Sequence, residues 1–454
     1  MTTDTDVRGA GGALVWAGDN LHLVWAYVAL AMFLLVLASL PLGVWSTPFN
    51  GVLKDGAQVG VEGVKEVGYL FALNWSLYSV AVLPFMAVFA VRVWVAMPET
   101  IQALSAAGMI RDAAFARVPG EAVLERWRKV HRGCFLLFFI IFICVMLFVM
   151  TDWWGVVAEP ILYPATLTGV TLADPVREFD WSVASLYEGS TVSKYPLLAF
   201  SFVGYVLVAG IATAVAFATC LSGLFFVAFM CGVTANRRRG WTLAAMPAKE
   251  DDRGGFRIFS PFFTAFICLS FTVAVGCLLM VIQNAYLRDP TSPNVFAFMF
   301  QDGGRLAHIV ETSSLTTILQ DAADWLFEPA MKVAANPQTG VGILVYAFTA
   351  LAAVAVSWGL LRSTARVAQA FSLEHSPALA AELGVTNRVA RGRLRDMELW
   401  PIGWMRLNQL VILVLAMALA LLSYRLILAP AGLVAFLGVN SVIKIFVRRR
   451  KAGR

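Results

Sequence analysis

The strongest constraint on this chain is a series of apolar runs long enough to cross a lipid bilayer. The run from Phe135 to Met150, FLLFFIIFICVMLFVM, has no charged residue and no alternation of polar and apolar positions. In lipid the backbone must satisfy its own hydrogen bonds, which limits spanning segments to helices of about 20 residues or closed barrels. Barrel strands would alternate over segments of about ten residues. The runs therefore predict an all-α bundle of transmembrane helices.

The composition excludes a water-soluble globule. Of the 454 residues, 59% are hydrophobic and 14% are charged. Soluble domains are about 45–50% apolar and about 25% charged. The same values exclude a disordered chain, because such chains are poor in apolar residues and rich in charge. We expect a polytopic membrane protein.

Eight apolar runs are candidate spans, and together they make a single integral membrane domain over 1–454. None of the segments between them is long enough to form a separate domain, since domains begin at about 50 residues. The predicted spans lie at about 22–46, 68–96, 133–151, 196–235, 259–287, 341–361, 407–424 and 427–446.

The basic residues alternate with these spans. Of the 35 Lys and Arg residues, 25 lie in alternate segments, and 8 lie in the segments between. Lys and Arg concentrate on the cytoplasmic side of membrane proteins. Both termini are therefore expected in the cytoplasm, with cytoplasmic segments at 97–132, 236–258 and 362–406 and outer loops at 152–194 and 288–340.

The run 196–235 is about twice as long as a span requires. If this run formed two short helices, every later loop would lie on the opposite side of the membrane. The basic residues would then no longer alternate with the spans. We therefore expect one long or strongly tilted helix that projects beyond the membrane, since tilt alone cannot absorb the excess.

Uncharged polar residues in the spans are candidates either for lining a polar path or for bridging neighbouring helices, which Asn and Gln commonly do. These candidates are Asn74, Ser76, Ser79, Gln283, Asn284, Asn408, Gln409 and Asn440.

Four small residues recur every fourth position in the long run 196–235. Such a stripe lets a second helix approach closely, either from the same chain or from another copy. The candidate packing residues are Gly210, Ala214, Ala218 and Ser222.

Two short helices are expected in the cytoplasmic segments. Val123, Leu124 and Trp127 share one face beside basic residues, a pattern typical of a helix on an anionic membrane surface. The sequence SPALAAELG at 376–384 indicates a helix of about two turns, with Ser376 as its cap and Gly384 at its left-handed end.

No pattern indicates chemistry. None of the four histidines falls within a predicted span, and no metal-ligand, phosphate-loop or nucleophile motif is present. The six cysteines lie in apolar runs without a C-x-x-C pair. We expect no catalytic residue, no metal and no cofactor.

Three functions remain open at this point. The first, favoured because most proteins with this many spans move something, is a channel- or transporter-like component for an unidentified solute. The second is a non-catalytic subunit of a larger envelope or secretion assembly, supported by an amphipathic pattern at 315–326 and the small-residue stripe. The third is a membrane-embedded enzyme acting on lipid. The expected partners are the lipid bilayer and a second copy or other envelope proteins, not nucleic acid, and the expected location is the bacterial cytoplasmic (inner) membrane.

Overall fold

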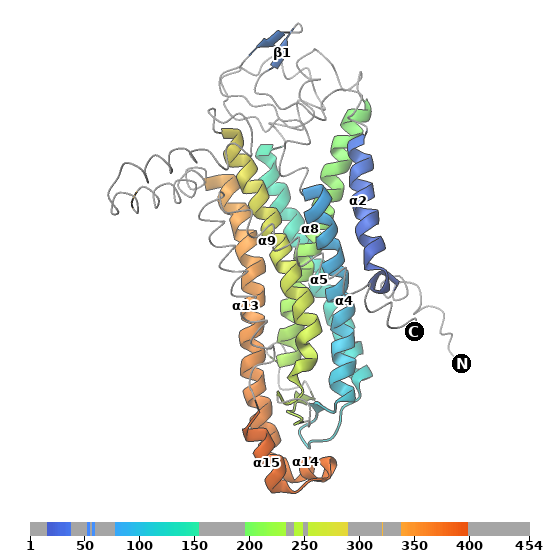
Figure 1. The fold of residues 1–454 in the computed structure, drawn as a ribbon, viewed down its shortest axis with the longest axis vertical. Coiled ribbons are helices and arrows are strands. Elements are labelled where there is room, and N and C mark those ends of the chain that lie inside the picture. The colour runs from blue at the N-terminus through green and yellow to red at the C-terminus, as the bar shows by residue number, and fades with distance from the viewer. Residues whose placement is uncertain are drawn as a thin grey trace, which may run out of the picture.

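The protein is a bundle of long helices (Figure 1). The computed structural model describes residues 16–37, 52–54, 57–59, 78–153, 196–232, 240–247, 253–288, 320 and 337–397. Within these residues, four helices are long and apolar enough to cross a membrane, over Leu83–Ala106, Ala209–Cys231, Phe256–Leu279 and Phe348–Glu374. The expectation of a helical membrane protein is confirmed at this level.

Helices account for most of the described chain. In order along the sequence, they are α2 (Leu21–Leu37), the π-helical turn η2 (Tyr78–Val82), α4 (Leu83–Ala106), α5 (Gly120–Trp153), α8 (Pro196–Cys231), the 3-10 turn η5 (Phe256–Phe259), α9 (Ser260–Arg288), α13 (Pro337–Glu374), α14 (Ser376–Leu383) and α15 (Asn387–Arg395).

Two short antiparallel ribbons accompany the helices. β1 (Val52–Lys54) pairs with β2 (Ala57–Val59), and β3 (Ile110–Arg111) pairs with β4 (Thr242–Leu243). The first ribbon joins neighbouring residues, whereas the second joins two segments that are far apart in the sequence.

The helix α9 lies at the centre of the bundle and packs mainly against α13 and α4. Of its most apolar stretch 83% is buried, against 33% for α13. Aromatic rings fill the space around it, and Phe262 and Phe266 are fully buried. By contrast, α5 exposes Leu136, Leu137, Ile140 and Ile141, as a helix that faces lipid does.

Six of the eight predicted spans overlap described helices. These are α2, α4 with η2, α5, α8, α9 and α13. The last two, 407–424 and 427–446, and both chain ends lie outside the described residues, as do nearly all of the outer loops. The count of eight and the cytoplasmic termini therefore stay predictions.

Three helices are much longer than a bilayer is thick. α5, α8 and α13 contain 34, 36 and 38 residues. At 1.5 Å per residue they are about 51–57 Å long, whereas the hydrocarbon core is about 30 Å thick. α8 runs without a break, so the chain does not reverse between Pro196 and Cys231.

The apolar end of α8 is buried by protein. Trp127, at the start of α5, makes ring contacts with Phe225, Phe226 and Phe229 of α8, with centroids 5.1–6.2 Å apart. Val123, Leu124 and Trp127 are buried there. The expectation that this face of 123–130 rests on the membrane surface is therefore wrong, because the aromatic end of α8 covers it.

Candidate functional site

The three predicted cytoplasmic segments come together at one end of the bundle, beside α14 and α15 (Figure 1). We call this the α14–α15 end. The β3–β4 ribbon joins the first segment to the second, and the amide of Ala244 donates to the carbonyl of Met109 at 2.7 Å. The amide of Ala245 donates to the Ser372 hydroxyl of α13 at 2.8 Å, which adds the third segment.

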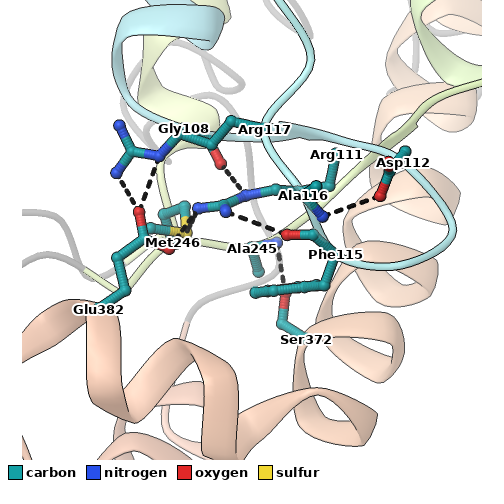
Figure 2. Close-up of polar contacts among 10 residues, drawn as sticks. All are labelled: Gly108, Arg111, Asp112, Phe115, Ala116, Arg117, Ala245, Met246, Ser372 and Glu382. Atoms are coloured by element: carbon teal, nitrogen blue, oxygen red, sulfur yellow. Dashed lines mark hydrogen bonds and ion pairs between the residues drawn. The ribbon is translucent and has the colours of Figure 1, made fainter.

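Arg111 lies where these segments meet, and its side chain is only 4% exposed (Figure 2). Within its own segment, Nε donates to the carbonyl of Gly108 at 2.6 Å, and Nη1 donates to that of Phe115 at 3.2 Å. Nη2 lies 2.6 Å from Oε2 of Glu382 in α14 and 3.8 Å from the sulfur of Met246. One guanidinium therefore binds all three segments, with the directed donors that distinguish arginine from lysine.

Glu382 accepts from a second arginine. Its other carboxylate oxygen, Oε1, accepts from Nε of Arg117 at 2.9 Å and also contacts Nη2 of that residue. Burial raises the pKa of the Glu382 carboxyl, but hydrogen bonds from Arg117 and Arg111 and the charges of both arginines outweigh this effect, so the pKa lies below its usual range. We call Arg111, Phe115, Arg117, Met246 and Glu382 the Arg111 cluster.

Phe115 holds a left-handed backbone conformation, with φ of 64°. This conformation costs about 1–2 kcal/mol for a residue with a side chain. The Asp112 carboxylate stabilises the turn by accepting from the amides of Ala114 and Ala116 at 2.9 and 2.8 Å. The Phe115 ring stacks on His375 at a centroid distance of 5.0 Å and lies 4.8 Å from the Arg111 guanidinium carbon. The strain is thus offset by contacts between the first and third segments.

The short helix predicted at 376–384 is present as α14. Gly384 ends it in the left-handed conformation, with φ of 63°, as predicted. Ser376 is not its cap, because His375 occupies that position. The buried Ser376 hydroxyl instead accepts from Nε of Arg391 at 2.8 Å and so ties α15 to α14.

The helix α15 is held firmly while its charges stay outside. Ala390 and Leu394 are fully buried, and Nε2 of Gln369 in α13 donates to the carbonyl of Leu394 at 2.6 Å. Arg388, Arg391 and Arg395 are exposed. At spacings of three and four residues, these three arginines share one face of the helix.

The structure places few of the predicted polar-path residues. Ser79 lies in η2 and is buried, and Gln283 and Asn284 lie near the end of α9. The other candidates, Asn74, Ser76, Asn408, Gln409 and Asn440, lie outside the described residues. The described part of the chain therefore brings none of them together into a path, and this assignment stays a prediction.

The small-residue stripe on α8 is partly buried and partly exposed. Ala214, Ala218 and Ser222 are fully buried, whereas Gly210 is half-exposed and a methyl group added there would meet nothing within 4 Å. A close approach of α8 to α9 lies instead at Gly223, where an added Cβ would lie 2.8 Å from the Phe266 ring of α9. That the stripe itself mediates association stays a prediction.

Polar pairs within the bundle satisfy one another. The Tyr78 hydroxyl bonds to the Thr213 hydroxyl, and the Trp94 indole N–H donates to the Thr219 hydroxyl at 2.9 Å. Each pair joins the η2–α4 region to α8. These contacts hold helices together, which is the common role of polar side chains between membrane helices.

The Arg111 cluster brings opposite fixed charges together, which can hold separate segments in one arrangement. Among the described residues, no group of three His, Cys, Asp or Glu side chains could hold a metal ion. The Arg111 cluster contains fixed charges and no nucleophile. Sequence reasoning did not single out Arg111 or Glu382, although an arginine directly after the apolar Met109 and Ile110 was an available signal, since such a charge is buried only with a partner.

Comparison with known proteins adds no family to this description. No protein-family model matches the chain, and no curated protein or solved structure is similar to it at a significant level.

Proposed function

We propose that this chain is a non-catalytic, membrane-embedded subunit of a larger envelope assembly, and that the α14–α15 end is where it meets its partners. The observation that carries the proposal is the Arg111 cluster, in which one buried guanidinium binds all three segments at that end. Buried charged networks fix one geometry, because a misplaced partner leaves an uncompensated charge. A surface that keeps one fixed shape is suited to binding a specific partner protein.

The packing of the described interior supports a structural role. At Gly276 of α9, an added Cβ would lie 2.9 Å from both Met86 and Tyr78. Phe226 of α8 and Phe262 of α9 are fully buried, with ring centroids 4.9 Å apart. Side chains thus fill the spaces where α4, α8 and α9 meet, as in a rigid scaffold.

A solute path through spans two, five, seven and eight remains the other proposal, as the sequence suggested. It depends on Asn and Gln positions of which only Gln283 and Asn284 lie on a described helix. Residence in the bacterial cytoplasmic membrane, with the α14–α15 end inside the cell, is likewise proposed from the distribution of Lys and Arg.

Purification of the full-length chain in a mild detergent tests the subunit role. We expect it to elute with other envelope proteins at a fixed ratio. The variant Arg111→Ala should remain in the membrane and lose these proteins, because the α14–α15 end no longer keeps its shape. Lys129→Ala is the matched control, since it removes a charge from an exposed pair with Glu125 at the same end.

Two outcomes would contradict the proposal. One is a chain that elutes alone and passes solute when it is reconstituted in liposomes. The other is an Arg111→Ala variant that keeps the same partners at the same ratio, which would show that the α14–α15 end is not the docking surface.

A further inference from the structure

The imidazole of His131 lies among three aromatic rings, just before the predicted span at 133–151. Its centroid is 5.4 Å from that of the Trp94 ring of α4, and the two rings meet edge to face. On α5 itself, the Trp127 ring lies 5.0 Å away and the Phe135 ring lies 6.0 Å away. The side chain is therefore packed as a ring among rings.

Two of these rings also hold α4 and α5 to a third helix, α8. Trp127 packs on Phe226 of α8 with centroids 5.1 Å apart. The Trp94 indole N–H donates to the Thr219 hydroxyl of α8 at 2.9 Å. His131 thus lies where α4, α5 and α8 meet, so a change in its charge acts on the packing of all three helices.

One nitrogen of this imidazole is buried without a partner. Nε2 of His131 is shielded from solvent and forms no hydrogen bond within the described part of the chain. In a neutral imidazole one nitrogen donates and the other accepts, whereas both nitrogens donate in the protonated form. A buried group without a partner costs more free energy when it is charged. Burial accordingly lowers the pKa of His131 from its ordinary value of 6.5.

The charged groups on the helices around His131 do not offset this effect. The helix α8 has no Asp, Glu, Lys, Arg or His, and its titratable residues are Tyr205, Cys220 and Cys231. The charged residues of α4 and α13, which also pack against α5, are Arg92, Glu99, Arg362, Arg366 and Glu374. The charged or titratable residues of α5 within two turns are Glu125, Arg126, Arg128, Lys129, Arg132 and Cys134. None of these groups contributes to the lowered pKa of His131, whose cause is burial.

We propose that His131 is an acid-sensitive contact, which releases the start of α5 from α4 and α8 when its imidazole takes up a proton. The neutral ring packs between Trp94 and Trp127, whereas the imidazolium needs water or a carboxylate at its buried nitrogen. The loop that bears Arg111 directly precedes α5, so the release also affects the α14–α15 end. This inference is independent of the proposed function, because it concerns the packing of one helix.

The direction of the pH effect follows from the lowered pKa. Because the pKa of His131 is lower in the folded chain than in the unfolded chain, the unfolded chain binds more protons as the pH falls below 6.5. The contribution of the neutral ring to stability is therefore fully present above the unfolded pKa. It is lost as the pH falls from 6.5 toward the folded value.

Melting temperatures of the full-length chain in a neutral detergent, at about pH 7.5 and about pH 5.5, test this inference. We expect acid to lower the melting temperature of the wild-type chain by about 2 °C or more beyond its effect on His131→Phe, which keeps a ring but cannot be protonated. His131→Gln gives the same comparison if the larger ring does not fit. His375→Phe is the matched control, because His375 also stacks on an aromatic ring, Phe115, and this variant should respond to acid as the wild type does.

Backbone hydrogen exchange of the wild-type chain locates the effect and needs no variant. The amides of 121–130 should exchange faster, relative to those of α9, at about pH 5.5 than at about pH 7.5. An unchanged ratio would overturn the inference, because α5 would then stay packed in acid. An equal fall in the melting temperatures of wild type and His131→Phe would assign the acid sensitivity to other groups. A wild-type chain that is equally or more stable in acid would mean that the tryptophan rings stabilise the imidazolium through cation–π contacts.

Discussion

The middle of the bundle and its α14–α15 end are held together in different ways. In the middle, helices meet through close packing, as at Gly223 against Phe266, and through neutral pairs such as Tyr78 with Thr213. At the α14–α15 end, segments from three parts of the sequence meet around the buried charge of Arg111 and its carboxylate partner Glu382.

The difference follows from the surrounding solvent. Lipid offers no hydrophobic driving force between helices, so small residues and close contact hold them together. Beyond the membrane, water drives apolar burial, as for Leu394 of α15, and lets charged groups lie at the edge of the packed region. The two regions should therefore respond differently to the same kinds of substitution.

The largest effect is expected from Arg111→Ala. This change leaves the carbonyls of Gly108 and Phe115 without their donors and Glu382 without its buried partner. Removing one member of a buried ion pair costs about 3–5 kcal/mol. The free energy of unfolding in detergent should fall by this amount, whereas Arg117→Ala, at a 58% exposed side chain, should cost much less. Equal losses would mean that the buried position of Arg111 is unimportant.

A smaller loss is expected from Ala218→Leu in the middle of the bundle. Ala218 is fully buried, so the added atoms must displace neighbouring helices, and overpacking of this kind costs about 1–3 kcal/mol. Gly210→Leu lies on the same stripe at an open position and serves as the control. Thermal unfolding in detergent measures both variants. A stable Ala218→Leu protein would show that this part of α8 is loosely packed.

A smaller, pH-dependent loss of about 1 kcal/mol is expected from Glu382→Gln, because the Glu382 side chain is 24% exposed and glutamine still accepts a hydrogen bond from Arg111. The pKa of Glu382 is lowered from 4.5 in the folded protein. Its ionised form therefore contributes stability above the unfolded pKa, and this contribution is lost as the pH falls through the folded value. Melting temperatures of the two proteins should differ at pH 7 and converge once the pH falls below the folded pKa of Glu382, which lies under 4.5. A constant difference would rule out this ionisation as the cause.

The smallest effect is expected from Lys129→Ala. Lys129 and Glu125 form a pair at 2.8 Å one helical turn apart, and both side chains are exposed. Their hydrogen bond and mutual charge lower the pKa of Glu125. Exposed pairs of this kind add little stability, since water screens them. The melting temperature should stay unchanged. A clear decrease would mean that water screens this pair less than its exposed side chains indicate.

Some parts of the structure could be predicted from local sequence. The apolar runs located α4, α5, α8, α9 and α13 because a span of lipid demands continuous apolar helix. The left-handed end of α14 at Gly384 was also predicted, since glycine accepts that conformation without steric cost. Each of these features depends on residues that are close together along the chain.

The Arg111 cluster could not be predicted in this way. Arg111 and Glu382 are separated by 271 positions, and hydropathy gives no sign that they meet. Hydropathy also cannot tell apolar residues that face lipid, such as Leu136, from those that face protein, such as Phe226. Both are equally apolar, and only packing distinguishes them.

The sequence by itself determined that this chain forms long apolar helices and concentrates its basic residues in alternate segments, because both properties follow from local composition. The tertiary structure alone decided which helix became the buried centre and how three separate segments close around Arg111. Those outcomes depend on contacts between residues that are distant in the sequence. The fit of side chains and the geometry of hydrogen-bond partners select one arrangement there, and apolar character alone does not.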